Sequence, residues 1–170
     1  MDGDELRALQ APLKQQYRDE PEAAVLTLTA GGDIDDAGIA CKVATGRALV
    51  TAGLHPATGG SGLEACSGDM LLEALVACAG VTLKAVATAI GVEIQSAHVR
   101  AEGDLDFRGT LAVDRGAAVG FTAIRLAFTL DTDASDDEIA TLITLTERYC
   151  VVYQTLAQKP DLSVSHERAA

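Results

Sequence analysis

One long apolar stretch, residues 67–91, constrains most strongly how this chain can fold. Its sequence is SGDMLLEALVACAGVTLKAVATAIG, the longest run with helical periodicity in the chain. We expect one broad face to carry Leu71, Leu72, Leu75, Cys78, Val81, Thr82, Ala85 and Ala89. Ser67 and Asp69 are candidate N-caps, and Gly91 is a natural end. A helix this apolar must be buried on most sides, so we expect the rest of the chain to wrap around it.

Length and composition fit a globular protein of ordinary domain size. The chain has 170 residues, and 48% of them are hydrophobic, which is enough for a core. It holds no run of 18 uncharged apolar residues, so we expect no membrane span. The formal net charge of −12 disfavours binding to nucleic acid and to anionic membranes. The acidic, polar start MDGDELRALQ is unlike a signal peptide, so we expect a cytoplasmic protein.

The cysteines and histidines show no metal-binding pattern. The four cysteines are Cys41, Cys66, Cys78 and Cys150, which lie far apart and form no CxxC pair. The three histidines have no ligand spacing around them, so we expect no metal and no cofactor. Structural disulfides are not expected in a reducing cytoplasm. A small thiol in an apolar helix is ordinarily a core residue, and this interpretation stays open for Cys78 taken alone.

The segments on either side of the apolar stretch alternate between strand and helix patterns. The expected elements are a helix Asp4–Tyr17, strands Ala24–Ala30, Ile39–Thr45 and Ala48–Ala52, the central helix, strands Val92–Phe107 and Phe121–Asp131, a helix capped by Ser135 that runs to about Ala157, and a last strand Leu162–His166. Gly31–Gly38 is predicted as a turn region. We expect the two long strands to pair antiparallel. This order predicts an α+β protein with a largely antiparallel sheet, in which residues 1–22 form an N-terminal helical extension and residues 23–170 the domain.

Three pieces of the sequence resemble the OsmC/Ohr family, the osmotically inducible and organic-hydroperoxide-resistance proteins. They are GDMLLEALVACAGVTLKAVA, GDLDF followed by GFTAIRLAFTLDTDAS, and ERYCVVYQTL, and the resemblance covers most of the chain from Ala24 onward. It implies an OsmC-like fold, with a largely antiparallel sheet wrapped around two long helices, built as an intertwined homodimer. It also implies a thiol-dependent peroxidase that acts on organic hydroperoxides and is reduced by an external dithiol. In that role Cys78 matches the peroxidatic cysteine and Cys150 the resolving cysteine.

The sequence departs from the family pattern near both cysteines. Cys150 is followed by Val151, where the family usually has proline. Members that reduce organic hydroperoxides carry an arginine just after the first strand, but residues 31–36 hold none. Arg18 and Arg47 are the nearest candidates for that cation.

Asp69 matches the family's acidic residue before the central helix, where glutamate is usual. It lies nine residues before Cys78, which on one straight helix means about 13 Å along the axis and the opposite face. We therefore expect the acid near each Cys78 to come from the partner chain, in a composite site with Arg47 or Arg18. The alternative is that Asp69 only caps the helix.

Two functions other than peroxide reduction remain compatible with the sequence. One is a binding protein on the same fold, which holds a small apolar ligand at the dimer seam and has passive cysteines. The other is a subunit interaction domain without a pocket. A titration of the thiols with peroxide separates the peroxidase from both of these.

Overall fold

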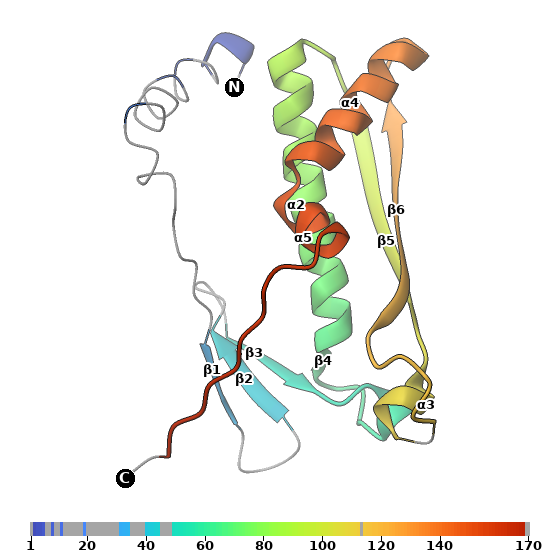
Figure 1. The fold of residues 1–170 in the computed structure, drawn as a ribbon. Coiled ribbons are helices and arrows are strands. Elements are labelled where there is room, and N and C mark those ends of the chain that lie inside the picture. Colours follow the sequence, from blue (N-terminus) through green and yellow to red (C-terminus); the bar gives the residue numbers. More distant parts are fainter. Residues whose placement is uncertain are drawn as a thin grey trace.

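The computed structural model describes residues 2–5, 8, 11, 19, 31–34, 40–44, 49–112 and 114–168 (Figure 1). In chain order the elements are β1 (Gly31–Ile34), β2 (Ala40–Ala44), β3 (Leu49–Gly53), the 3-10 turn η2 (Pro56–Thr58), β4 (Ala65–Cys66), α2 (Ser67–Ile90), β5 (Ser96–Leu105), α3 (Phe107–Thr110), β6 (Phe121–Asp131), α4 (Asp136–Tyr149) and α5 (Val151–Ala157). The predicted strand Ala24–Ala30 and most of the predicted helix Asp4–Tyr17 lie outside the described residues. The mixture of helices with mainly antiparallel strands confirms the predicted fold class.

Helix α2 forms over the predicted apolar stretch. Gly91 ends it in the left-handed conformation, with φ 77°, which glycine adopts without strain. The prediction of Ser67 or Asp69 as N-cap was wrong, because Cys66 takes that position and makes no side-chain capping bond. The buried side chains recur every three or four residues and are Leu75, Ala79, Leu83, Val86 and Ala87. The predicted buried face was therefore correct only in part.

Strands β5 and β6 pair antiparallel, as predicted, and form a ribbon along one side of α2 (Figure 1). Strand β6 has the predicted bounds, whereas β5 begins at Ser96 rather than at Val92. Every second side chain of β6 turns toward the helices, namely Ile124, Leu126, Phe128 and Leu130. The ribbon and the helices thereby enclose two core clusters, one around Leu83 and Leu142 and the other around Leu75 and Ala79.

The second helical segment is two helices, not the single helix to Ala157 that the sequence predicts. Ser135 begins α4 as predicted, in a capping box where its N–H donates to the Glu138 carboxylate at 2.8 Å. Helix α4 ends at Tyr149, Cys150 follows with an extended backbone (φ −75°, ψ 106°), and α5 starts at Val151. No proline or glycine marks this break, so the helical pattern of the sequence continues through it.

The earlier strands form a separate four-stranded sheet in the order β1-β2-β3-β4. Strands β1 to β3 pair antiparallel, and the short β4 runs parallel to β3 and leads directly into α2. Residues 31–34 were predicted as a turn, which was wrong because their backbone pairs along β2 from Gly31 to Ile34. The predicted last strand Leu162–His166 was also wrong, since this segment has no strand pairing within the described residues.

One face of α2 stays uncovered by the described part of the chain. Val81 is 74% exposed on this face, and Leu71 is exposed as well. By length and composition alone α2 could cross a membrane, a test that the core helix of a globular protein also passes. The ribbon, α4 and α5 thus cover α2 on part of its circumference only, which differs from the expectation that one chain would wrap it.

Candidate functional site

Cys78 and Cys150, 72 residues apart in sequence (150 minus 78), meet in the core beside α2. Cys78 lies half-buried near the middle of α2, and Cys150 is fully buried at the junction of α4 and α5. Both are free thiols that share one core cluster, and each shifts the pKa of the other. The fold thus brings together the two cysteines that the family resemblance implied as a redox pair.

The extended backbone at Cys150 places the first N–H groups of α5 beside the Cys78 sulfur. The groups that lower the pKa of this thiol are the N–H groups of Val152 and Val151, the Cys150 thiol and the Thr82 hydroxyl. Burial raises the pKa of the Cys78 thiol, but these donors outweigh burial and hold the pKa below that of an ordinary thiol. Because the thiolate is the nucleophilic form of cysteine, Cys78 is the more reactive member of the pair.

The pKa of the Cys150 thiol is shifted in the opposite direction. Burial raises this pKa most, and the N–H of Tyr153 lowers it by a smaller amount. The neighbouring Cys78 sulfur raises it again, because it accepts the Cys150 proton in a hydrogen bond and repels a second negative charge. Cys150 therefore keeps its proton at a pH where Cys78 is already ionised.

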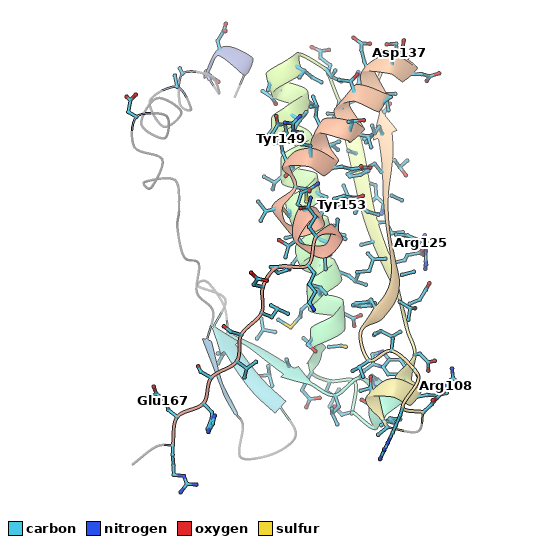
Figure 2. All side chains as sticks on the ribbon, viewed as in Figure 1. Arg108, Arg125, Asp137, Tyr149, Tyr153 and Glu167 are labelled. Atoms are coloured by element: carbon cyan, nitrogen blue, oxygen red, sulfur yellow. The ribbon has the colours of Figure 1, made fainter. Side chains whose placement is uncertain are left out.

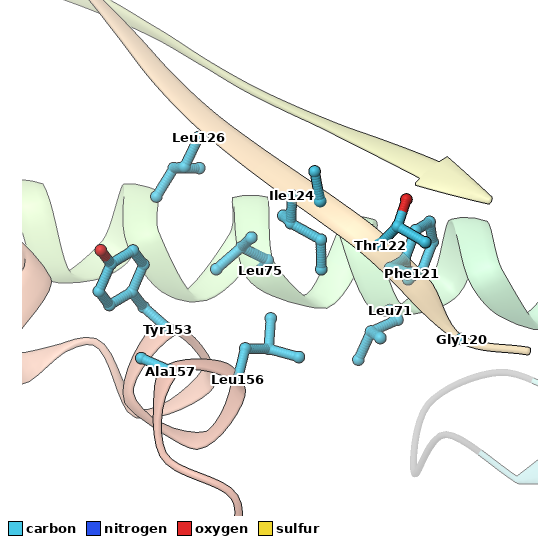
Figure 3. Close-up of a pocket in the computed structure, with 11 residues that line it drawn as sticks. Leu71, Leu75, Gly120, Phe121, Thr122, Ile124, Leu126, Tyr153, Leu156 and Ala157 are labelled. Carbon is cyan, nitrogen blue, oxygen red and sulfur yellow. The ribbon is translucent and has the colours of Figure 1, made fainter. Parts of the chain in front are cut away.

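An apolar cavity of about 520 Å³ opens between α2, β6 and α5 (Figure 3). Its lining includes Leu71, Leu75, Ile124, Leu126 and Leu156, with Tyr153 at one end. Leu75 also belongs to the core cluster that contains both cysteines. The cavity therefore borders the core cluster that contains the thiol pair, although neither cysteine lines it, and it has the surface to hold an apolar group.

The other three predicted site residues are not brought to Cys78 by the described part of the chain. Asp69 is exposed in the first turn of α2 and lines a separate cavity of about 380 Å³. Arg18 and Arg47 lie outside the described residues. A cation beside Cys78, and an acid supplied by a partner chain, stay predictions.

Two arginines on the ribbon and its connecting segment are engaged with carboxylates away from the cysteines. Arg125 forms a two-pronged ion pair with Asp104, at 2.5 and 2.7 Å. Arg108 pairs with Asp106 at 2.6 Å, and Figure 2 shows both arginines pointing outward from the helices. The donors that the described residues supply to Cys78 are all uncharged groups.

His55 makes contacts that fit a structural role. The Nδ1 atom of His55 accepts a hydrogen bond from the N–H of Ala57 at 3.0 Å, and its ring stacks on Phe107 with centroids 4.9 Å apart. Cys66 is half-buried as the N-cap of α2, and Cys41 lies in β2. Among the described residues, no group of three potential metal ligands occurs.

The sequence analysis did not identify the groups that donate to Cys78. Thr82 could have been found from spacing, since it follows Cys78 by four residues and lies on the same side of the helix. The N–H groups of Val151 and Val152 depend on the helix break, which no residue in the sequence signals. The sequence alone therefore could not identify these two N–H groups, and the structure was needed to find them.

Comparisons with known proteins identify the fold. The family model of OsmC-like proteins matches residues 60–165 of this chain. The chain is similar to the OsmC-like protein from Mycoplasma pneumoniae, with TM-score 0.66, 16% identity, and coverage of 79% of this chain and 89% of that one. It is also similar to an organic hydroperoxide resistance protein from Elizabethkingia anophelis, with TM-score 0.62, 15% identity, and coverage of 80% and 91%. An organic hydroperoxide resistance protein from Legionella pneumophila superposes with TM-score 0.61, 15% identity, and coverage of 78% and 90%. A comparison with curated proteins finds no match.

Proposed function

The chain belongs to the OsmC-like protein family, and from that premise we propose that it is a thiol-dependent peroxidase that reduces organic hydroperoxides. The contact between two thiols with opposite pKa shifts carries this proposal. A peroxidatic cysteine must be a thiolate near neutral pH, which is the direction of the shift at Cys78. A resolving cysteine must reach the oxidised sulfur, and Cys150 shares a core cluster with Cys78.

In the proposed cycle, the Cys78 thiolate attacks the terminal oxygen of the hydroperoxide. The O–O bond breaks, the sulfur becomes a sulfenic acid, and the organic oxygen leaves as an alkoxide that takes up a proton to give an alcohol. The Cys150 thiol then attacks the sulfenic sulfur, so that water leaves and a disulfide forms. An external dithiol reduces this disulfide by exchange and restores both thiols.

The apolar cavity beside the thiol pair supports an organic substrate rather than hydrogen peroxide. Its lining includes four leucines and one isoleucine, which gain free energy from contact with a hydrocarbon group and offer little to a small polar molecule. The proposed biological role is antioxidant defence in the cytoplasm, with no cofactor and no nucleic-acid partner.

A homodimer is part of the proposal. The uncovered apolar face of α2 supports a second copy of the chain as its partner, since exposed apolar surface of this kind marks an interface. In that assembly Asp69 and either Arg47 or Arg18 would approach the partner's cysteine pair.

The same cavity favours a second candidate function, a binding protein for a small apolar ligand with passive cysteines. A volume of about 520 Å³ lies within the range of ligand pockets. The existence of this cavity disfavours the third interpretation, a subunit interaction domain without a pocket.

The peroxidase is tested by treating the reduced protein with cumene hydroperoxide and counting thiols by mass spectrometry. We expect the loss of two thiols and a linked Cys78–Cys150 peptide, with Cα atoms within about 4.4–6.8 Å in the oxidised protein. Cys150→Ser should stop the reaction at a sulfenic acid on Cys78 that dimedone traps, and Cys66→Ser should behave like the unaltered protein. A disulfide through Cys66 or Cys41 would contradict the assignment, and unreacted thiols would favour the binding protein.

A further inference from the structure

Phe121 faces the helices because the pairing of β5 with β6 is irregular at one step. Continued alternation along β6 would turn Thr122 inward and Phe121 outward. The ladder pairs Leu105 with Phe121 but Asp104 with Ala123, so β6 carries one extra residue, Thr122, at this step. Such a β-bulge reverses the facing of the residue beyond it. As a result Phe121 is half-buried and lines the apolar cavity between the ribbon and the helices.

The ring of Phe121 is seated against Gly103 of β5, where no side chain would fit. A Cβ atom at Gly103 would lie 2.4 Å from Cε1 and 2.5 Å from Cδ1 of the ring, closer than carbon atoms approach in real structures. At the other edge of the ring, its Cζ atom lies 3.6 Å from where a Cβ atom of Gly68 would stand, in the first turn of α2. The ring therefore spans the space between β5 and the start of α2.

The apolar cavity extends from the cysteine pair's core cluster to this ring (Figure 3). Tyr153 lies at one end and packs against the core cluster that contains both cysteines. Phe121 lies at the other end and belongs to neither core cluster. A hydroperoxide whose O–OH group approaches Cys78 from the Tyr153 end therefore extends its hydrocarbon part toward Phe121.

A second cavity lies on the far side of the ring. It is the cavity of about 380 Å³ that Asp69 lines, together with His55 and Cys66. Among the described residues, Phe121 is the one that lines both this cavity and the apolar cavity of about 520 Å³. The ring is thus the partition between the two spaces.

We propose that Phe121 is the specificity-determining residue of this site, because its ring closes the apolar cavity and limits the length of the alkyl chain that a substrate can place there. This inference rests on the proposed peroxidase function. Each methylene that enters an apolar cavity strengthens binding about fourfold, whereas a carbon that would pass the ring gains nothing. Affinity should therefore rise with chain length up to a limit and then level off.

The test uses the reduced protein and straight-chain primary alcohols from butanol to decanol, which resemble the alcohol products and need no redox chemistry. Isothermal titration calorimetry measures the dissociation constant at each length. Phe121→Ala removes the partition, so the limit should move to longer chains and decanol should bind roughly tenfold or more tightly than it binds the unaltered protein. Phe107→Ala is the matched control and should leave the limit unchanged, since Phe107 lines the second cavity but not the first.

Gly103→Ala tests the seat of the ring. The added methyl group displaces the ring from β5 toward the helices and into the cavity, so the limit should move to shorter chains. In the Phe121→Ala background the same substitution should have no effect on the limit, because the ring that it displaces is absent. Circular dichroism and thermal unfolding check that each variant folds. If Phe121→Ala does not fold, Phe121→Leu replaces it, since leucine keeps an apolar side chain and lacks the ring.

An unchanged limit in the variant that lacks the ring overturns the role of Phe121, and so does affinity in the unaltered protein that shows no dependence on chain length. An equal change in Phe107→Ala also overturns it, because that result assigns the effect to general loosening of the wall. The proposed function is tested separately, by the Cys78–Cys150 disulfide that hydroperoxide should form in the unaltered protein. If that disulfide does not form while Phe121→Ala moves the limit, the peroxidase is overturned and Phe121 still limits the length of an apolar ligand.

Discussion

At the scale of single residues, the reactivity of Cys78 depends on what other residues direct at its sulfur. The partial positive charge at the start of α2 cannot activate Cys78. Cys78 is the twelfth residue of that helix, and the effect of this charge fades within the first turn. Val151 contributes a backbone N–H to the sulfur, which a proline at this position would lack. Valine in place of the family's usual proline after Cys150 therefore adds an N–H donor near Cys78. The sequence shows no arginine at the family's usual position for the cation that would activate this cysteine.

We predict that Val151→Pro raises the pKa of Cys78. The substitution removes one N–H from the sulfur, while proline is tolerated at the first position of α5 and the extended backbone of Cys150 suits a residue before proline. Because the pKa of Cys78 lies below its usual value, the thiolate is lost as pH falls through that lowered pKa. A higher pKa moves this loss to higher pH, and at pH 7 the reaction with hydroperoxide should slow roughly three- to tenfold.

Stopped-flow measurement of the reaction between pH 5 and 9 checks this prediction. Val151→Ala is the matched control, since it shortens the same exposed side chain and keeps the N–H. A pH profile displaced equally in both variants would show that the side chain, and not the N–H, is responsible.

At the scale of elements, the sequence predicts those segments whose local pattern and final environment agree. The alternation of Phe121–Asp131 is the pattern of a strand with one face on a core, and β6 has those bounds. The break at Cys150 could not be predicted, because helix-compatible residues continue on both sides and tertiary packing sets the extended conformation. Strand β1 was missed for the converse reason: glycine and aspartate favour turns locally, but pairing with β2 holds Gly31–Ile34 as a strand.

The capping box of α4 yields a prediction about stability. Ser135→Ala removes the side-chain acceptor for the Glu138 N–H and should lower the free energy of unfolding by about 1 kcal/mol. Ser67→Ala is the control, since Ser67 begins α2 without a capping role and should change the stability much less. Urea unfolding at one fixed protein concentration measures both. Equal losses in the two variants would mean that the capping box contributes nothing specific.

At the scale of the whole molecule, the sequence predicts more burial than the described chain provides. The apolar periodicity of α2 requires cover on most sides, yet Val81 and other apolar side chains of this helix stay exposed. The alternating segment Leu162–His166 has a strand pattern, but Leu162 is 79% and Val164 is 99% exposed. We propose one physical explanation for both mismatches, which is that a second copy of the chain supplies the missing surface and the missing strand edge.

We therefore predict an obligate homodimer whose interface buries more than roughly 2,000 Å², with the uncovered face of α2 inside it. Val81→Asp would place an unpaired charge in that interface, so the dimer should be lost and the helical circular dichroism should weaken at the same concentration. Leu111→Asp, at another exposed apolar residue, is the control and should sediment as a dimer. Analytical ultracentrifugation at micromolar concentration distinguishes the outcomes. A folded monomer of the unaltered protein, or a Val81→Asp variant that stays dimeric, would show that α2 does not need a second copy to cover it.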